Sequence, residues 1–121
     1  MAKNMEIALL FDFYGDMLTE KQRDMVELYY EDDLSLSEIA ENAGITRQGV
    51  RDAIKRAEAQ MLEMEERLGL VARFRRMRDG FAEIQKAAGE IAELNDRLGR
   101  SREIGERARR IAALSHTMAE E

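Results

Sequence analysis

Apolar residues recur at spacings of three and four along most of this chain, and no proline interrupts them in its 121 residues. That period places apolar side chains on one face of an α-helix, whose interior proline would break. Strict alternation of apolar and polar residues, the pattern of a half-buried strand, never lasts long enough to form one. The sequence therefore predicts an all-α protein, beginning with an apolar helix over roughly residues 3–14.

Two later helices have a recognisable start. Thr19 with Gln22, and Ser35 with Glu38, have the spacing of a capping box, in which each side chain accepts a hydrogen bond from the backbone N–H of the other residue. Thr46 is placed to cap a further helix.

The segment after Ser35 has the spacing of a helix-turn-helix. A helix of eight or nine residues from Leu36 is followed by Gly44, where a left-handed cap would end it, and a second helix follows from Arg47. Ala40 is small enough to let the two helices cross closely. The residues expected to fill the wedge between the helices are Ile39, Ile45, Val50 and Ile54.

Long helices are expected from Arg47 onward. The first continues through residue 68, with an inner face of Val50, Ile54, Ala57, Met61, Met64 and Leu68, and Gly69 ends or bends it. The apolar residues of the next helix, over residues 70–98, are Phe81, Ile84, Ala88, Ile91, Leu94 and Leu98. Those of the last helix are Ile104, Ala108, Ile111 and Met118.

Three residues in each of these two helices recur every seventh position, as in a seam between paired helices: Ile84, Ile91 and Leu98, then Ile104, Ile111 and Met118. Pairing within one chain and pairing between two chains are both open. We expect a helix-turn-helix domain over residues 1–69 and a helical extension over residues 70–121.

The net charge of −6, from 19 basic and 25 acidic residues, by itself argues against a nucleic-acid partner. The charges are unevenly distributed, however. Residues 1–44 carry −8, residues 45–80 carry +3 and residues 81–121 carry −1. The basic excess is therefore confined to the second helix of the motif and the segment after it.

On that second helix Arg47, Arg51 and Lys55 follow one another at a spacing of four, with Gln48 and Arg56 beside them. Cations neutralise phosphates, and Arg and Gln form paired hydrogen bonds with base edges. A solvated helix face is the alternative, but the place of this stripe in the motif favours contact with nucleic acid. We predict the nucleic-acid-binding residues Arg47, Gln48, Arg51, Lys55 and Arg56.

A second basic cluster surrounds Phe74 and Met77, and consists of Arg73, Arg75, Arg76 and Arg78. It would either add contacts to phosphates, including an RNA backbone, or form a solvated face with the two apolar residues turned inward. Both interpretations stay open.

The chain lacks the residues that several other functional classes require. The chain has no cysteine and one histidine, His116, which excludes thiolate zinc sites, cysteine nucleophiles and a histidine cluster. It also lacks a phosphate-binding loop and a nucleophile–base pair, so we predict no enzyme, no metal site and no cofactor. Three adjacent carboxylates, Glu31 to Asp33, precede a capping serine and are more typical of a hydrated turn than of a metal site.

The longest apolar run, residues 7–11, is too short to cross a bilayer, and no cleavable signal pattern follows it. The sequence therefore predicts a cytoplasmic protein without membrane insertion.

Several strings in this order resemble the YlxM family of small bacterial helix-turn-helix proteins: LFDFYG at 10–15, LTEKQ at 18–22, YYEDDLSL at 29–36 and RQGVRDAIKR at 47–56. The resemblance covers roughly residues 5–78. Residues 18–68 also resemble the region 4 domain of bacterial sigma factors, which reads the promoter element upstream of a gene. The chain departs from the family's usual recognition helix at Gly49 and Arg51, where alanine and an aromatic residue are usual.

The resemblance implies a regulatory DNA-binding protein of the cytoplasm. Genes of the family typically lie beside those of the signal recognition particle protein, which implies a role in protein targeting, with DNA or the particle's RNA as partner. It also implies a homodimer formed through residues 70–121. A protein-interaction module is the alternative, which docks on the particle's GTPase or its RNA without sequence-specific DNA binding. Its acidic N-terminal half would dock on a basic partner, such as the RNA-binding domain of that GTPase.

Overall fold

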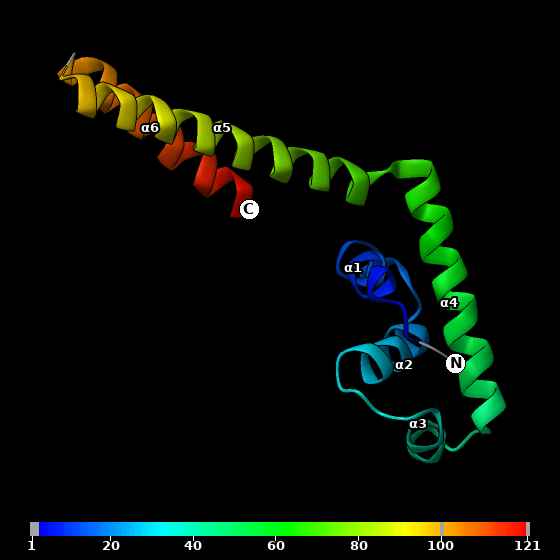
Figure 1. Ribbon diagram of the computed structural model, residues 1–121. Helices are drawn as coiled ribbons and strands as arrows, with labels where there is room; N and C mark the ends of the chain where they lie inside the picture. Colours follow the sequence, from blue (N-terminus) through cyan, green and yellow to red (C-terminus); the bar gives the residue numbers. More distant parts are fainter. Residues whose placement is uncertain (1–2, 100, 121) are drawn as a thin grey trace. The chain divides into compact units, whose positions relative to one another are not determined.

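The computed structural model describes residues 3–99 and 101–120, and every regular element among them is a helix (Figure 1). The elements are α1 (Met5–Tyr14), the 3-10 helix η1 (Gly15–Met17), α2 (Glu20–Tyr30), α3 (Leu36–Ala43), α4 (Arg47–Leu68), α5 (Leu70–Leu98) and α6 (Arg102–Glu120). The predicted all-α class and the predicted N-terminal helix are confirmed. The helices form two compact units, one extending to Val71 and the other beginning at Ala72.

Helices α2 and α3 begin at the predicted capping boxes. Thr19 Oγ1 accepts a hydrogen bond from the N–H of Gln22 at 3.2 Å, and Gln22 Oε1 accepts one from the N–H of Thr19 at 3.0 Å. Ser35 and Glu38 exchange the same pair of hydrogen bonds at 3.1 and 3.2 Å. Each box satisfies backbone donors that the first turn of a helix otherwise leaves without partners.

In the first unit, α1, α2 and α3 all pack against α4 (Figure 1). One buried cluster joins α1, the end of η1, α2, the later turns of α4 and the start of α5: Ile7, Leu10, Tyr14, Leu18, Val26, Ala57, Met61 and Val71. A second joins α2, α3 and the first turns of α4: Tyr29, Leu36, Ile39, Ala40, Val50 and Ile54. These two clusters orient α4 along most of its length.

The turn between α3 and α4 has the predicted helix-turn-helix form. Gly44 ends α3 with φ +70°, in the left-handed region that glycine adopts without steric strain. The N–H groups of Gly44 and Ile45 both donate to the carbonyl oxygen of Ala40, at 2.9 and 3.2 Å. Ala40 itself is buried between the helices.

Two residues predicted to point inward do not. Ile45 is 44% exposed and Leu68 is 56% exposed. Ile45 lies in the turn, and the wedge between the helices is filled without it by Ile39, Val50 and Ile54. Leu68 ends α4, and after Gly69 turns the chain it is Val71 that supplies the next buried side chain.

In the second unit α5 and α6 pair through small and polar residues. The buried residues are Ala88, Ala92 and Asn95 on α5, and Gly105, Ala108 and Ser115 on α6. The side chain of Asn95 closes the turn, because its Nδ2 donates to the carbonyl of Ser101 at 2.6 Å while its Oδ1 accepts from the N–H of Ser101 at 3.0 Å. A Cβ added to Gly105 would lie 3.1 Å from Asn95 Nδ2, so the two helices approach closely there.

The predicted seven-residue seam does not form this contact. Ile84, Ile91 and Leu98 are 46%, 49% and 62% exposed, and Ile104, Ile111 and Met118 are 48–49% exposed. Small residues beside the seam make the contact within the chain, since they let two helices approach more closely than isoleucine does. Large apolar side chains on both helices are left about half exposed.

Candidate nucleic-acid interface

The second helix of the motif, α4, begins at a capped and exposed N-terminus. Thr46 Oγ1 accepts a hydrogen bond from the N–H of Gly49 at 3.0 Å. The aligned peptide dipoles give this end of the helix a partial positive charge, which favours an anion nearby. Thr46, Arg47 and Gln48 are all exposed.

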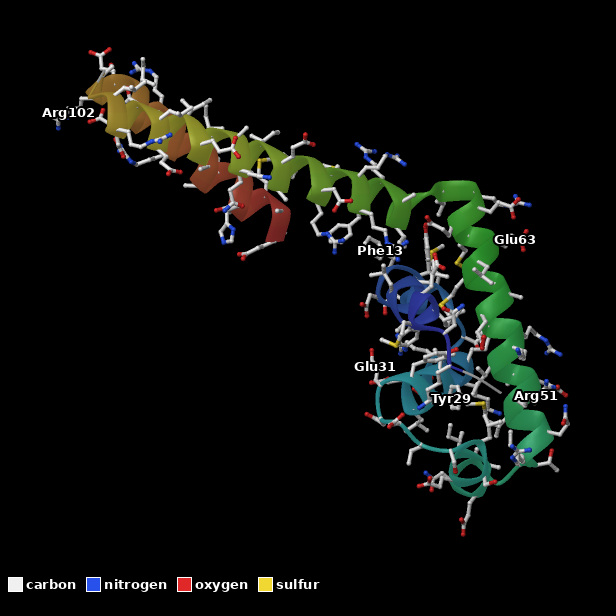
Figure 2. All side chains as sticks on the ribbon, viewed as in Figure 1. Phe13, Tyr29, Glu31, Arg51, Glu63 and Arg102 are labelled. Atoms are coloured by element: carbon white, nitrogen blue, oxygen red, sulfur yellow. The ribbon has the colours of Figure 1, made fainter. Side chains whose placement is uncertain are left out.

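Three of the predicted cations lie together on α4. Arg47, Arg51 and Lys55 are exposed at successive steps of four residues, while Val50 and Ile54 are fully buried. Figure 2 shows Arg51 on the side of α4 that faces away from α1, α2 and α3. The core therefore holds these cations outward on one stripe of the helix.

The other two predicted residues, Gln48 and Arg56, are also exposed on α4. Gln48 Nε2 donates a hydrogen bond to Asp52 Oδ1 at 2.9 Å. Asp52 was absent from the predicted set, although its spacing of four from Gln48 is a signal that identifies such a pair. It places one carboxylate among the cations and holds the amide of Gln48 in one orientation.

Some arginines of α6 have carboxylate partners, whereas the α4 cations Arg47, Arg51, Lys55 and Arg56 have none among the described residues. On α6, Arg102 pairs with Glu106 at 2.9 Å, and Arg109 of α6 pairs with Asp96 at 2.8 Å. Over residues 3–99 and 101–120, no carboxylate lies within ion-pair distance of the four α4 cations. They remain available to an external anion.

Two tyrosines attach α4 to the helices that pack against it. The hydroxyl of Tyr14 donates to Glu65 Oε1 at 2.6 Å, and that of Tyr30 donates to Glu58 Oε1 at 3.3 Å. Burial, with the neighbouring carboxylate of Glu58, raises the pKa of Tyr30 to about 12. Burial likewise raises the pKa of Tyr14. Both phenols therefore stay protonated as hydrogen-bond donors at neutral pH.

The second basic cluster lies on the first turns of α5. Arg73, Arg75, Arg76 and Arg78 are all exposed. The guanidinium of Arg78 lies 5.9 Å from the ring centre of Phe74, a cation–π distance, and its Nε lies 3.8 Å from Asp79 Oδ1. Phe74 is half-buried, whereas Met77 is 47% exposed rather than turned inward.

Within the described residues, no helix is both long and apolar enough to cross a membrane. In the same residues, no three histidine, aspartate or glutamate side chains are grouped closely enough to hold a metal ion.

Comparison with known proteins gives a family match over most of the chain. Residues 1–99 match the family model described as "UPF0122: Putative helix-turn-helix protein, YlxM / p13 like". A UPF0122 protein of Desulforamulus reducens is 55% identical over 69 residues, which are 57% of this chain and 59% of that relative. One of Symbiobacterium thermophilum is 49% identical over 81 residues, 67% of this chain and 76% of the relative. One of Bacillus cereus is 42% identical over 98 residues, 81% of this chain and 89% of the relative.

The resemblance to YlxM proteins is thereby confirmed, and with it the helix-turn-helix assignment of α3 and α4. The matched residues include all of α3 and α4, and therefore the helix that carries the α4 cations. This chain therefore belongs to the UPF0122 family, the YlxM/p13-like helix-turn-helix proteins.

Proposed function

We propose that this protein is a cytoplasmic regulator that binds double-stranded DNA with the first turns of α4. The observation that supports this proposal is the set of four exposed cations on the second helix of the motif, which have no carboxylate partner among residues 3–99 and 101–120. The major groove of B-form DNA admits an α-helix, whereas the major groove of A-form RNA is too deep and narrow for one. DNA is therefore the partner that fits α4.

The side chains divide between two tasks. Arg47, Arg51 and Lys55 form one stripe and would contact phosphates or, for the arginines, the O6 and N7 atoms of guanine. Gln48, held by Asp52, would contact a base edge. Arg56, four residues after Asp52, would add a phosphate contact.

The salt dependence of DNA binding tests this proposal. The affinity of the wild-type protein for a random-sequence duplex is measured by fluorescence anisotropy at several salt concentrations. The same titration is made with the double variant Arg47→Ala, Arg51→Ala. Loss of two phosphate contacts should flatten the slope of log affinity against log salt by about 2.

A matched control uses two arginines of α6, Arg102→Ala with Arg107→Ala. Both pair with glutamates four residues away, so their loss should leave the slope unchanged. A wild-type slope in the Arg47, Arg51 double variant would overturn the assignment of α4.

RNA is the second candidate partner, and the α5 arginines favour it. Arg73 and Arg76 are exposed and have no carboxylate partner in the part of the chain that the structure describes. Such a cluster would follow an RNA backbone by charge and shape. If RNA is the target, Arg73→Ala with Arg76→Ala should weaken binding to the signal recognition particle RNA more than the α4 double variant does.

A role in the signal recognition particle pathway follows from the family resemblance, and the acidic N-terminal segment favours an alternative within it. Residues 1–44 carry −8, which suits docking on a basic protein surface such as that of the particle's GTPase. In this alternative the Arg47, Arg51 variant would bind the GTPase as the wild type does, and neither would bind DNA.

We also propose that the second unit, residues 72–121, joins two copies of the chain. The seam residues of α5 and α6 recur every seventh position and are about half exposed. A second copy would cover them with an equivalent apolar face.

A further inference from the structure

A groove lies between α2 and α3, on a part of the first unit that the proposed DNA contact does not use. Its volume is about 370 Å³, within the range of small ligand pockets. Its apolar lining comes from Met25, Leu28, Ile39, Ala43 and Ile45. None of the α4 cations lines it.

The groove explains the exposed position of Ile45. This side chain is 44% exposed, while Met25 and Leu28 are half-buried. Ile39 is fully buried and forms the floor. Covering apolar side chains at a concave surface with a partner stabilises the complex, by roughly 25 cal/mol for each Å² of apolar surface removed from water.

Acidic residues surround this apolar lining. Asp24 lies in the groove, and Glu20 and Glu27 lie one turn before and after it on the same side of α2. On α3, Glu38 is one turn before the lining residue Asn42. Residues 20–45 contain eight acidic and two basic residues, and Lys21 is the one cation among the lining residues.

We propose that this groove is a docking site for a basic amphipathic helix of a partner protein. Apolar side chains of that helix would enter the groove at positions i, i+3 and i+4, and its lysines or arginines would face Glu20, Asp24 and Glu38. The acidic border repels the phosphates of nucleic acids and anionic lipids, which leaves a cationic polypeptide as the occupant. The site does not depend on whether α4 binds DNA.

Charge and apolar contact would have different effects on such a complex. The carboxylates speed association at low salt, because opposite charges steer the encounter over roughly the Debye length of 10 Å at 0.1 M salt. The apolar floor holds the bound helix and sets its rate of dissociation. The proposal therefore predicts binding that weakens with salt but persists at high salt.

The test uses a synthetic amphipathic peptide of about 18 residues, long enough to form a helix, with leucine on one face and lysine on the other. Binding to the full chain is measured by anisotropy, and the site by amide chemical shifts in nitrogen-15 NMR spectra. We expect saturable binding with shift changes at Met25, Leu28 and Ile39. A peptide with glutamate in place of lysine should bind at least about tenfold more weakly.

Two matched pairs of variants separate the groove from other surfaces. Ile45→Gln should weaken peptide binding by about tenfold, the scale of an apolar anchor, whereas Leu62→Gln on α4, where Leu62 is 50% exposed, should not. Asp24→Asn should weaken binding and reduce its salt dependence, whereas Glu90→Gln on α5 should do neither. All four positions are exposed, so the variants are expected to fold.

The proposal is overturned if the peptide fails to saturate, if its shifts are confined to α5 and α6, or if Ile45→Gln binds it as the wild type does. The Arg47→Ala, Arg51→Ala variant should still bind the peptide. Failure of the groove and failure of DNA binding by α4 are thereby distinguished.

Discussion

The hydroxyl of Tyr14 in α1 donates a hydrogen bond to Glu65 Oε1 in α4 at 2.6 Å, across 51 residues of sequence. Both groups also serve the start of α5: Leu70 N–H donates to the Tyr14 oxygen at 3.2 Å, and Val71 N–H donates to Glu65 Oε1 at 3.0 Å. Gly69, which precedes α5, has no side chain with which to cap it. Residues of α1 and α4 therefore satisfy the first backbone donors of α5.

Replacing Tyr14 with phenylalanine should lower the free energy of unfolding by about 1–3 kcal/mol. The substitution keeps the buried ring but removes the donor to Glu65 and the acceptor for Leu70. Urea denaturation followed by circular dichroism measures the change. Glu65→Gln, which keeps an acceptor oxygen, should cost less, and equal stability of Tyr14→Phe and wild type would contradict the account.

The protein should lose stability at alkaline pH, and Tyr30 should contribute to the loss. Its pKa is raised to about 12 in the folded protein, chiefly by burial, against about 10 when unfolded. The folded state thus holds this proton more tightly. The contribution is fully present below about pH 10 and is lost as the pH rises toward about 12.

The measurement is the free energy of unfolding of wild type and Tyr30→Phe at several pH values between about 9 and 12. Tyr14 has its pKa raised in the same direction and contributes to both curves. The variant should therefore decline less steeply without becoming flat. Parallel curves would show that Tyr30 does not titrate differently in the folded and unfolded states.

Gly49→Ala should stabilise the protein by up to about 1 kcal/mol, because alanine exceeds glycine in helix propensity. The added Cβ would lie 3.1 Å from Thr46 Oγ1 and 3.6 Å from Ile45 Cδ1. The first contact is tight, but Glu38 carries a Cβ at the same position of the Ser35 cap, where the hydrogen bond is 3.1 Å. A lower melting temperature than that of wild type would show that the Thr46 cap cannot adjust.

Asp52→Asn should strengthen binding to random-sequence DNA several-fold if α4 is the contact surface. The change removes a carboxylate that repels phosphates and keeps an oxygen to accept from Gln48. Glu66→Gln, an exposed neutralisation later on α4, is the control and should have little effect. Unchanged or weaker binding by Asp52→Asn would place the DNA elsewhere.

The double variant Ile84→Asp, Ile91→Asp should sediment as a monomer if the seam of α5 joins two chains. Aspartate on both residues would place charge in an apolar interface. The control Ala82→Asp, Gly89→Asp adds the same charges at the same spacing to exposed residues on the other side of α5, and should sediment like wild type. Sedimentation of the seam variant at the wild-type rate would remove the dimer.

Helix ends were predictable from the sequence, because a cap depends on residues three or four apart. Thr19, Ser35 and Thr46 each accept the backbone hydrogen bond that their spacing predicts, and Gly44 has the predicted positive φ. The predicted cations of α4 are all exposed, whereas Val50 and Ile54 of the same turns are buried. Asp52 was missed because the prediction selected cations and a base-contacting amide.

The sequence predicted which residues share a side of a helix better than it predicted which apolar residues are buried. Ile45 and Leu68 are apolar at helical spacing, yet both are exposed, because burial requires another element to cover the side chain. The residues of α5 that α6 covers are Ala88, Ala92 and Asn95 rather than the larger residues of the seam. Helical period could not choose between these neighbouring stripes, since both lie on the same side of α5.

The sequence by itself determined that this chain is helical, where its helices begin and end, and which side of α4 carries positive charge. Those properties follow from local spacing and backbone chemistry. The tertiary structure alone decided that α2 and α3 leave an apolar groove with an acidic border, and that Tyr14 and Glu65 cap α5. Each of these depends on residues distant in sequence, which only the packing of the helices brings together.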